Sequence, residues 1–271
     1  MALTGVGLAG CGRMGEPMLR AMRAQGFEAR GFDIRAPNSH SDLADAITDS
    51  VQDFSQNLRI LVTVVRDITQ TEQLLFTDQN LIGCAGQLET IVICSTLSPR
   101  YVRALRARVP ANIRLIDAPM SGARVAAEER RLSFMQGGDK DDISAIQPLF
   151  DAMGSSFHHM GPFGSGMAAK VLNNLLAASN TVMTRMVLDW AESLQLDEEK
   201  LLDLINKSSG QNWFTSNFHQ IEFSRDGYTP ENTIGILKKD VLSALDAAPS
   251  GADTRLPDLL AALIEELPPK S

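Results

Sequence analysis

The stretch Gly10-Cys-Gly12-Arg-Met-Gly15 constrains the fold more than any other part of this 271-residue chain. It follows a run of small apolar residues over positions 4–9 and precedes apolar side chains at three- and four-residue spacing. That order predicts a strand, a glycine turn and a helix. Gly10 permits a tight turn, Gly12 lets the backbone approach a pyrophosphate, and Gly15 lets helix and strand pack closely. The stretch therefore predicts a dinucleotide-binding turn with the phosphates at the helix N-terminus.

Asp33 bears on which dinucleotide, NAD or NADP, this turn would bind. It lies 21 residues after Gly12, at the end of a strand predicted over residues 27–32. An acid in this place can accept hydrogen bonds from both ribose hydroxyls, and its charge would repel a 2′-phosphate. The sequence therefore favours NAD over NADP. Arg35, two residues later, could still reach such a phosphate, so NADP stays possible. The alternative interpretation of Asp33 is a solvated turn residue.

Runs of β-branched and apolar residues recur along the first 160 residues. They cover residues 60–65, 91–94 and 113–116, with a helical stretch over 99–108 between the last two. Such runs are typical of strands that are buried on both faces. Weaker strand candidates lie at 132–136 and 156–159. Strands that alternate with helices predict an α/β fold with a parallel, doubly wound sheet.

Helical periodicity dominates after Gly161. A long apolar segment without proline follows three glycines, at 161, 164 and 166, and reaches about Leu194. Asp197 is a predicted N-cap, and Thr229-Pro230 predicts an N-cap and first helical position for a helix that ends before Pro249. The sequence therefore predicts two domains, residues 1–160 and an all-α domain over residues 161–271. The long helix would join them.

The composition argues against several classes of partner. The formal charge is −8, which leaves no basic stripe for nucleic acid. Cys11, Cys84 and Cys94 form no CxxC pair, which favours a reducing, cytoplasmic location over a disulfide framework. His158-His159 lack a partner at metal-ligand spacing, so we expect no metal site. Polar residues interrupt the apolar segment over 171–188, which favours a buried helix over a membrane span.

Lys170 and Asn174 form the most suggestive pair in the second half of the chain. Residues four apart share one face of a helix, and Gly166, one turn earlier, leaves space beside the ammonium. A lysine desolvated in an apolar cleft has a lowered pKa and can exchange protons near neutrality. The alternative is a lysine that snorkels from the end of a buried helix.

Other polar stretches follow predicted strands. Asp117-Ala-Pro-Met-Ser121-Gly122 lies where parallel strands face a ligand crevice, and a serine hydroxyl beside backbone N–H groups suits a carboxylate. The alternative is a turn that ends the strand. Thr96 follows another strand, before a Ser98-Pro99 helix start. Lys239 could lie on a solvated helix face, and Trp213 could be a core aromatic.

Taken together, these stretches resemble the β-hydroxyacid dehydrogenase family, which includes 3-hydroxyisobutyrate dehydrogenase. Residues 7–15, 117–122, 161–174 and 239–240 match in the family's order and spacing. The resemblance implies a Rossmann-type nucleotide-binding domain like that of 6-phosphogluconate dehydrogenase, and a helical domain for substrate binding and oligomerisation. It also implies an active site between the domains and assembly as a homodimer or homotetramer.

The same resemblance implies a role for each matching residue. Lys170 would be the catalytic acid/base and Asn174 would hold the substrate. Ser121 and Gly122 would take the substrate carboxylate, and Trp213 would face the substrate. The cofactor would be bound by Gly10, Gly12, Arg13, Met14, Gly15, Asp33, Thr96 and Lys239.

The implied activity is NAD(P)-dependent hydride transfer between the nicotinamide and a small β-hydroxy acid or semialdehyde. Arg124 and Arg130 stand where the family usually has glycine, and Arg124 could either clamp a second acidic group or face solvent. These departures leave the identity of the substrate open. Two alternatives remain, a catalytically silent nucleotide-binding protein and an imine reductase on the same fold. Such imine reductases usually replace the lysine that Lys170 matches.

Overall fold

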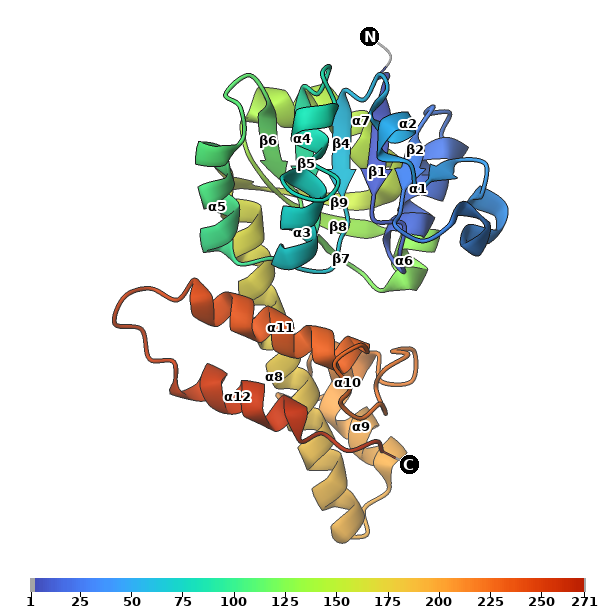
Figure 1. The fold of residues 1–271 in the computed structure, drawn as a ribbon. Coiled ribbons are helices and arrows are strands. Elements are labelled where there is room, and N and C mark those ends of the chain that lie inside the picture. The colour runs from blue at the N-terminus through green and yellow to red at the C-terminus, as the bar shows by residue number, and fades with distance from the viewer. Residues whose placement is uncertain (1–2, 271) are drawn as a thin grey trace. The chain divides into compact units, whose positions relative to one another are not determined.

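A nine-stranded sheet forms the centre of the first part of the chain, within the residues 3–270 that this computed structural model describes (Figure 1). Its order is β3-β2-β1-β4-β5-β6-β8-β7, and β9 pairs with β8. The strands are β1 Val6–Ala9, β2 Arg30–Phe32, β3 Ile47–Thr48, β4 Ile60–Thr63, β5 Thr90–Ile93, β6 Arg114–Asp117, β7 Met120–Ser121, β8 Leu132–Gly137 and β9 Gly154–Gly161.

The sheet is parallel from β3 to β6, and β8 runs parallel to β9. In contrast, β8 is antiparallel to β6 and β7. The connections between β6, β7 and β8 hold no long crossover helix, which a parallel neighbour would need. The mostly parallel sheet confirms the predicted fold class.

Helices cover both faces of this sheet, as a doubly wound fold requires. They are α1 Gly15–Ala24, the 3₁₀ helix η1 Pro37–Leu43, α2 Val51–Ser55, α3 Ile68–Leu75, α4 Leu81–Cys84, α5 Pro99–Arg108, α6 Arg124–Glu128 and α7 Lys140–Met153. One core contains Met18 and Met22 of α1 with Phe150 of α7, and the other contains Leu74 of α3 with Val102 of α5. Burial of apolar side chains on both faces is the main force that stabilises such a layer structure.

The chain divides into two units, residues 1–170 and 171–271. The second unit contains helices and no strands in its described part, with most of α8 Ser165–Ser193 followed by α9 Glu198–Asn206, α10 Trp213–Ser216, α11 Thr233–Asp246 and α12 Arg255–Glu265. Its own core joins Val182 of α8 to Phe214, Val241 and Ile264.

The predicted start of one helix is wrong. Thr229 and Pro230 were expected to begin it, but α11 begins at Thr233 with Asn232 as the N-cap. The Asn232 side chain accepts from Gly235 N at 3.0 Å and donates to Gly227 O at 2.7 Å. Because one amide can close the preceding turn and cap the helix, it displaces the threonine from that role. The caps predicted at Ser98 and Asp197 are confirmed.

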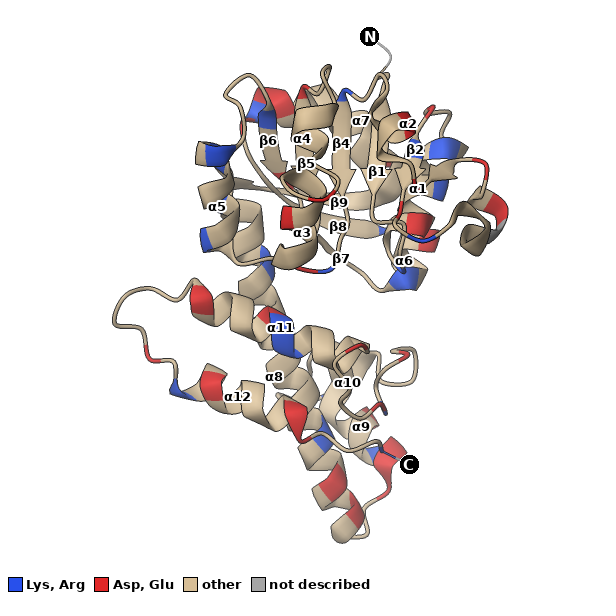
Figure 2. Ribbon diagram, viewed as in Figure 1, with Lys and Arg blue, Asp and Glu red and all other residues tan. Residues whose placement is uncertain are grey.

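Two basic residues hold the C-terminal segment in the second unit. Arg185 of α8 is 1% exposed and donates to the carbonyl oxygens of Ser224, Asp226 and Pro268 at 3.0, 2.9 and 2.5 Å. The Lys270 ammonium lies 3.0 Å from Asp189, in a region where Figure 2 shows acidic residues at the end of α8 and the start of α9. The segment from Pro268 to Lys270 therefore packs as part of this unit.

Candidate active site

The glycine turn between β1 and α1 has the shape that the sequence predicts. Gly10 has φ +96°, and a Cβ there would lie 2.6 Å from Val64 O. A Cβ at Gly15 would lie 2.0 Å from Gly10 O, whereas a Cβ at Gly12 would meet nothing within 4 Å. No side chain of the described residues caps the start of α1 at Met14. The turn thus combines open space at Gly12 with uncapped helix N–H groups, which fits a bound pyrophosphate.

Asp33 follows β2 and is buried, and its carboxylate is paired with the Arg35 guanidinium. Arg35 Nε lies 3.0 Å from Asp33 Oδ1, Arg35 Nη2 lies 3.2 Å from Asp33 Oδ2, and Arg35 Nη2 also donates to Cys11 O at 2.8 Å. Burial acts to raise the pKa of the Asp33 carboxyl, but the hydrogen bonds and charge of Arg35 outweigh burial and lower the pKa. Asp33 is therefore ionised and held at the glycine turn.

Lys170 lies in the second turn of α8 with its ammonium turned toward the Ser121 loop. Its side chain is 8% exposed, and Nζ donates to Ser121 Oγ at 3.2 Å. This burial differs from that of a snorkelling lysine, whose ammonium reaches water. Two residues predicted for the site from separate stretches therefore lie within hydrogen-bond distance.

The first turn of α8 is held by Asp117, a residue for which the sequence pattern predicts no role of its own. Asp117 Oδ1 accepts from Gly164 N and Oδ2 accepts from Met167 N, both at 2.6 Å. The signal that could have found it is an acid at the end of a strand, since a carboxylate can cap a helix N-terminus.

In the second unit, Asn174, Lys239 and Asp240 form a connected group. Asn174 Nδ2 donates to Asp240 Oδ2 at 2.6 Å, and Lys239 Nζ lies 2.9 Å from Asp240 Oδ1. Asp240 is 2% exposed and also had no predicted role. Its carboxylate takes the amide N–H of Asn174, so the amide orientation is fixed.

The remaining residues predicted for the site differ in exposure and in the residues that they contact. Arg124 lies exposed on α6 and pairs with Glu128 at 2.7 Å, and Gly122 has φ +125°. Thr96 is half-buried after β5. Arg13 is exposed in the glycine turn. Trp213 packs beside Phe214 in the second unit, with ring centroids 6.1 Å apart. The roles of these residues stay predictions.

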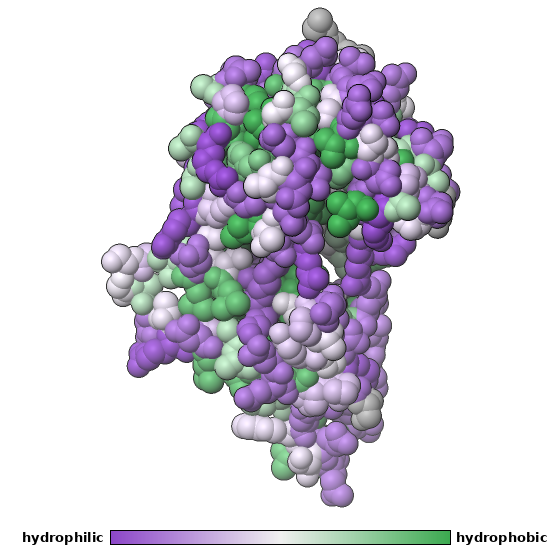
Figure 3. Space-filling model, viewed as in Figure 1, coloured by the Kyte–Doolittle hydropathy of each residue, from purple (hydrophilic) through white to green (hydrophobic). Residues whose placement is uncertain are grey.

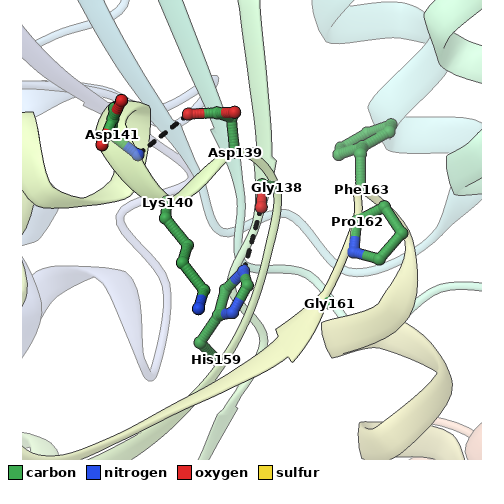
Figure 4. Close-up of a pocket in the computed structure, with 8 residues that line it drawn as sticks. All are labelled: Gly138, Asp139, Lys140, Asp141, His159, Gly161, Pro162 and Phe163. Atoms are coloured by element: carbon green, nitrogen blue, oxygen red, sulfur yellow. Dashed lines mark hydrogen bonds between the residues drawn. The ribbon is translucent and has the colours of Figure 1, made fainter.

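A cavity of about 520 Å³ lies elsewhere in the first unit, between the start of α7 and the end of β9 (Figure 4). Figure 4 shows Lys140 and His159 beside each other, and His159 Nε2 lies 3.0 Å from Gly138 O. Its lining contains none of the residues predicted for the site. Within residues 3–270, no group of three His, Cys, Asp or Glu side chains could hold a metal ion. None of the described helices is long and apolar enough to cross a membrane.

Two family models match nearly the whole chain. The NAD binding domain of 6-phosphogluconate dehydrogenase matches residues 5–161, which is more than half of the chain. The model described as "NAD-binding of NADP-dependent 3-hydroxyisobutyrate dehydrogenase" matches residues 164–268.

Individual relatives agree with these models. Human mitochondrial 3-hydroxyisobutyrate dehydrogenase is 27% identical over 97% of this chain and 80% of its own. An NAD-dependent L-serine dehydrogenase of Pseudomonas aeruginosa is 30% identical over 75% of this chain and 70% of its own. The structure of Mycobacterium tuberculosis 3-hydroxyisobutyrate dehydrogenase with L-serine has a TM-score of 0.82 at 25% identity, covering 98% of this chain and 94% of the other. The chain belongs to the β-hydroxyacid dehydrogenase family of NAD(P)-dependent oxidoreductases.

Proposed function

We propose that the protein interconverts the hydroxyl group of a small β-hydroxy acid and the corresponding carbonyl group, with Lys170 as the acid/base. The observation that carries this proposal is the buried Lys170 ammonium, which donates to the Ser121 hydroxyl at 3.2 Å. The relatives named for 3-hydroxyisobutyrate and L-serine support the substrate class, because both acids carry a hydroxyl β to a carboxylate.

The proposed residues divide the chemistry among them. When bound, the nicotinamide accepts or supplies the hydride. Lys170 takes the alcohol proton during oxidation and returns a proton to the forming alkoxide during reduction. Ser121 and the backbone of Gly122 hold the carboxylate. Asn174, with its Nδ2 held by Asp240, orients the reacting oxygen.

We assign these tasks to the two predicted domains. Residues 1–160 bind the dinucleotide, through Gly10, Gly12, Arg13, Met14 and Gly15. Residues 161–271 bind the substrate and mediate assembly, and Lys239 lies in this part. Thr96 contacts the nicotinamide and Trp213 the substrate. Arg124 supplies a second anchor for an acidic substrate, for which its pair with Glu128 would have to open.

A spectrophotometric screen tests the proposed activity. We expect a change in NADH absorbance with 3-hydroxyisobutyrate, L-serine, small sugar acids or the matching semialdehydes. Reduction of cyclic imines without turnover of any acid would instead support an imine reductase. Tight NADH binding without turnover of any compound would support a silent binding protein. Either of these two results contradicts the proposal.

We propose that Asp33 makes NAD the preferred cofactor, since its ionised carboxylate can accept from ribose hydroxyls once Arg35 moves aside. Asp33→Ala should raise the Kd for NADH about 10-fold, because charge-assisted hydrogen bonds are lost. It should lower the Kd for NADPH, because the repulsion is lost while Arg35 remains. Nicotinamide fluorescence titrations measure both values.

The matched control is Asp42→Ala, which removes the same charge from an exposed acid paired with Arg20. It should leave both Kd values unchanged. A wild-type protein that binds NADPH more tightly than NADH would refute the proposed preference.

We further propose assembly as a homodimer or homotetramer through the helices of the second unit. Leu172, Leu176, Met183 and Trp190 lie on one face of α8, and each is more than half exposed. Figure 3 shows apolar surface in the region of α11 and α12 as well. A row of exposed apolar side chains along one helix face is typical of protein–protein interfaces. The free thiols of Cys11, Cys84 and Cys94 support a reducing, cytoplasmic location.

A further inference from the structure

We propose that Asp117 is a positioning residue for Lys170: its carboxylate fixes the start of α8 against the end of β6, which places the ammonium at Ser121. This inference rests on the proposed role of Lys170. Asp117 does not touch the reacting atoms in this account. It acts on the reaction through the helix that carries the lysine.

The carboxylate of Asp117 is fully engaged by the helix start. Asp117 is 0% exposed, and its two oxygens accept separately from Gly164 N and Met167 N at 2.6 Å. These are N–H groups that a helix start leaves without intrahelical partners. A charged acceptor with two short bonds fixes both the rotation and the height of this turn. Lys170 follows Met167 by three residues, so its position depends on this turn.

Two glycines allow the helix to come this close to the sheet. A Cβ at Gly166 would lie 2.2 Å from Met135 O, and a Cβ at Gly137 would lie 2.3 Å from Asp117 Oδ1. Both contacts are too short for any side chain, so the first turn of α8 lies directly on the backbone of β8. A second contact, from Leu97 N to Met167 Sδ at 3.3 Å, joins the same turn to the loop after β5.

The partner of the lysine is fixed from the same strand end. Ser121 lies four residues after Asp117, and the pairing of β7 with β8 sets Ser121 opposite Ser133. Asp117 is therefore linked to both partners of the Lys170–Ser121 hydrogen bond. It is linked to Ser121 through the chain, and to the helix of Lys170 through its bonds to Gly164 and Met167. Displacing a catalytic group by about 1 Å can slow the catalysed reaction about 100-fold. Contacts that hold the Lys170 ammonium in place therefore affect the rate.

The charge on Asp117 is a cost to stability rather than a benefit. Burial raises the pKa of its carboxyl, and the N–H groups of Gly164 and Met167 and the nearby Arg103 only partly offset that effect. Burial, together with the charge of the Asp117 carboxylate, raises the pKa of the Cys94 thiol. A raised pKa means that stability is lost as the pH rises through the folded-state pKa.

Asp117→Asn tests the inference, because the new NH₂ group would face an N–H donor of the helix start. We expect kcat to fall about 10- to 100-fold with KM and the Kd for NADH nearly unchanged. Amide hydrogen exchange in residues 163–172 should accelerate in the absence of cofactor and substrate. The control is Asp139→Asn, because Asp139 also caps a helix of this unit, with its exposed Oδ1 accepting from Asp141 N and Asp142 N at the start of α7. It should keep the wild-type kcat.

A double-mutant cycle separates positioning from a general loss of structure. If Asp117 acts through Lys170, then Asp117→Asn should cause no further loss in a Lys170→Ala background. Losses that multiply would overturn the inference, and so would a wild-type kcat in Asp117→Asn. If Asp117→Asn does not fold, Gly166→Ala displaces the same turn and should reproduce the fall in kcat. A Lys170→Ala variant with normal turnover would refute the proposed function itself, which distinguishes the two failures.

Discussion

Replacing Lys170 with alanine should lower kcat about 100- to 10,000-fold, the usual contribution of a general acid/base. The alcohol proton would then lack its proposed acceptor, because the Lys170 amino group beside Ser121 would be removed. NADH binding should persist, because the glycine turn and Asp33 lie at other strand ends. Steady-state kinetics with the preferred acid, together with NADH fluorescence titration, measure the two effects.

Lys170→Arg sharpens the same experiment. Arginine keeps the positive charge but does not release its proton at any working pH, so this variant should be about as slow as the alanine variant. Lys140→Ala, which removes an exposed lysine from the same unit, is the control and should keep the wild-type rate. Near-normal turnover of both Lys170 variants would show that another group moves the proton.

Arg185→Ala should destabilise the second unit by about 3–5 kcal/mol, from the cavity left by a large buried side chain and three carbonyls without their donor. Those carbonyls belong to Ser224, Asp226 and Pro268, which lie 39 to 83 residues further along the chain. Burial lowers the pKa of the Arg185 guanidinium, but arginine remains charged near neutrality. Urea denaturation followed by circular dichroism measures the loss in the free energy of unfolding.

Two further variants define what this arginine contributes. Arg185→Lys keeps a charge but has no planar fork, so it should recover part of the stability and not all of it. Arg255→Ala removes an arginine from the surface of the same unit, where it pairs with Asp253, and should leave the denaturation midpoint unchanged. Equal midpoints for Arg185→Ala and the wild type would show that the C-terminal segment is held by other contacts.

The sequence predicts best where the physical cause is local. The positive φ of Gly10 and the close approach of Gly15 to Gly10 O are local features of the glycine turn, and Ser98-Pro99 places the start of α5 at Pro99. The start of α11 was missed because Thr229 and Asn232 are both good caps. The choice between them depends on a hydrogen bond from Asn232 back to Gly227 O.

Residue patterns in the sequence do not predict contacts between residues that are far apart in the chain. Asp117 meets Gly164 and Met167 across 47 and 50 residues, and Asp240 meets Asn174 across 66. A lone acid in a strand or a helix has many possible partners, and spacing alone does not select one. The same limit applied to Arg185, which the sequence shows only as an interruption of an apolar helix.

The Ser121 stretch joins two regions that differ in their tolerance of mutation. On one side, Asp117 is fully buried and Gly137 and Gly166 have no space for a methyl group. On the other side, Ala123, Arg124 and Val125 are exposed. Substitutions can therefore accumulate at these exposed positions without displacing the helix that carries Lys170. If Arg124 and Lys170 have the roles proposed above, a lineage with this architecture can change which acids it accepts by drift at its surface, while selection on the buried side preserves its proton chemistry.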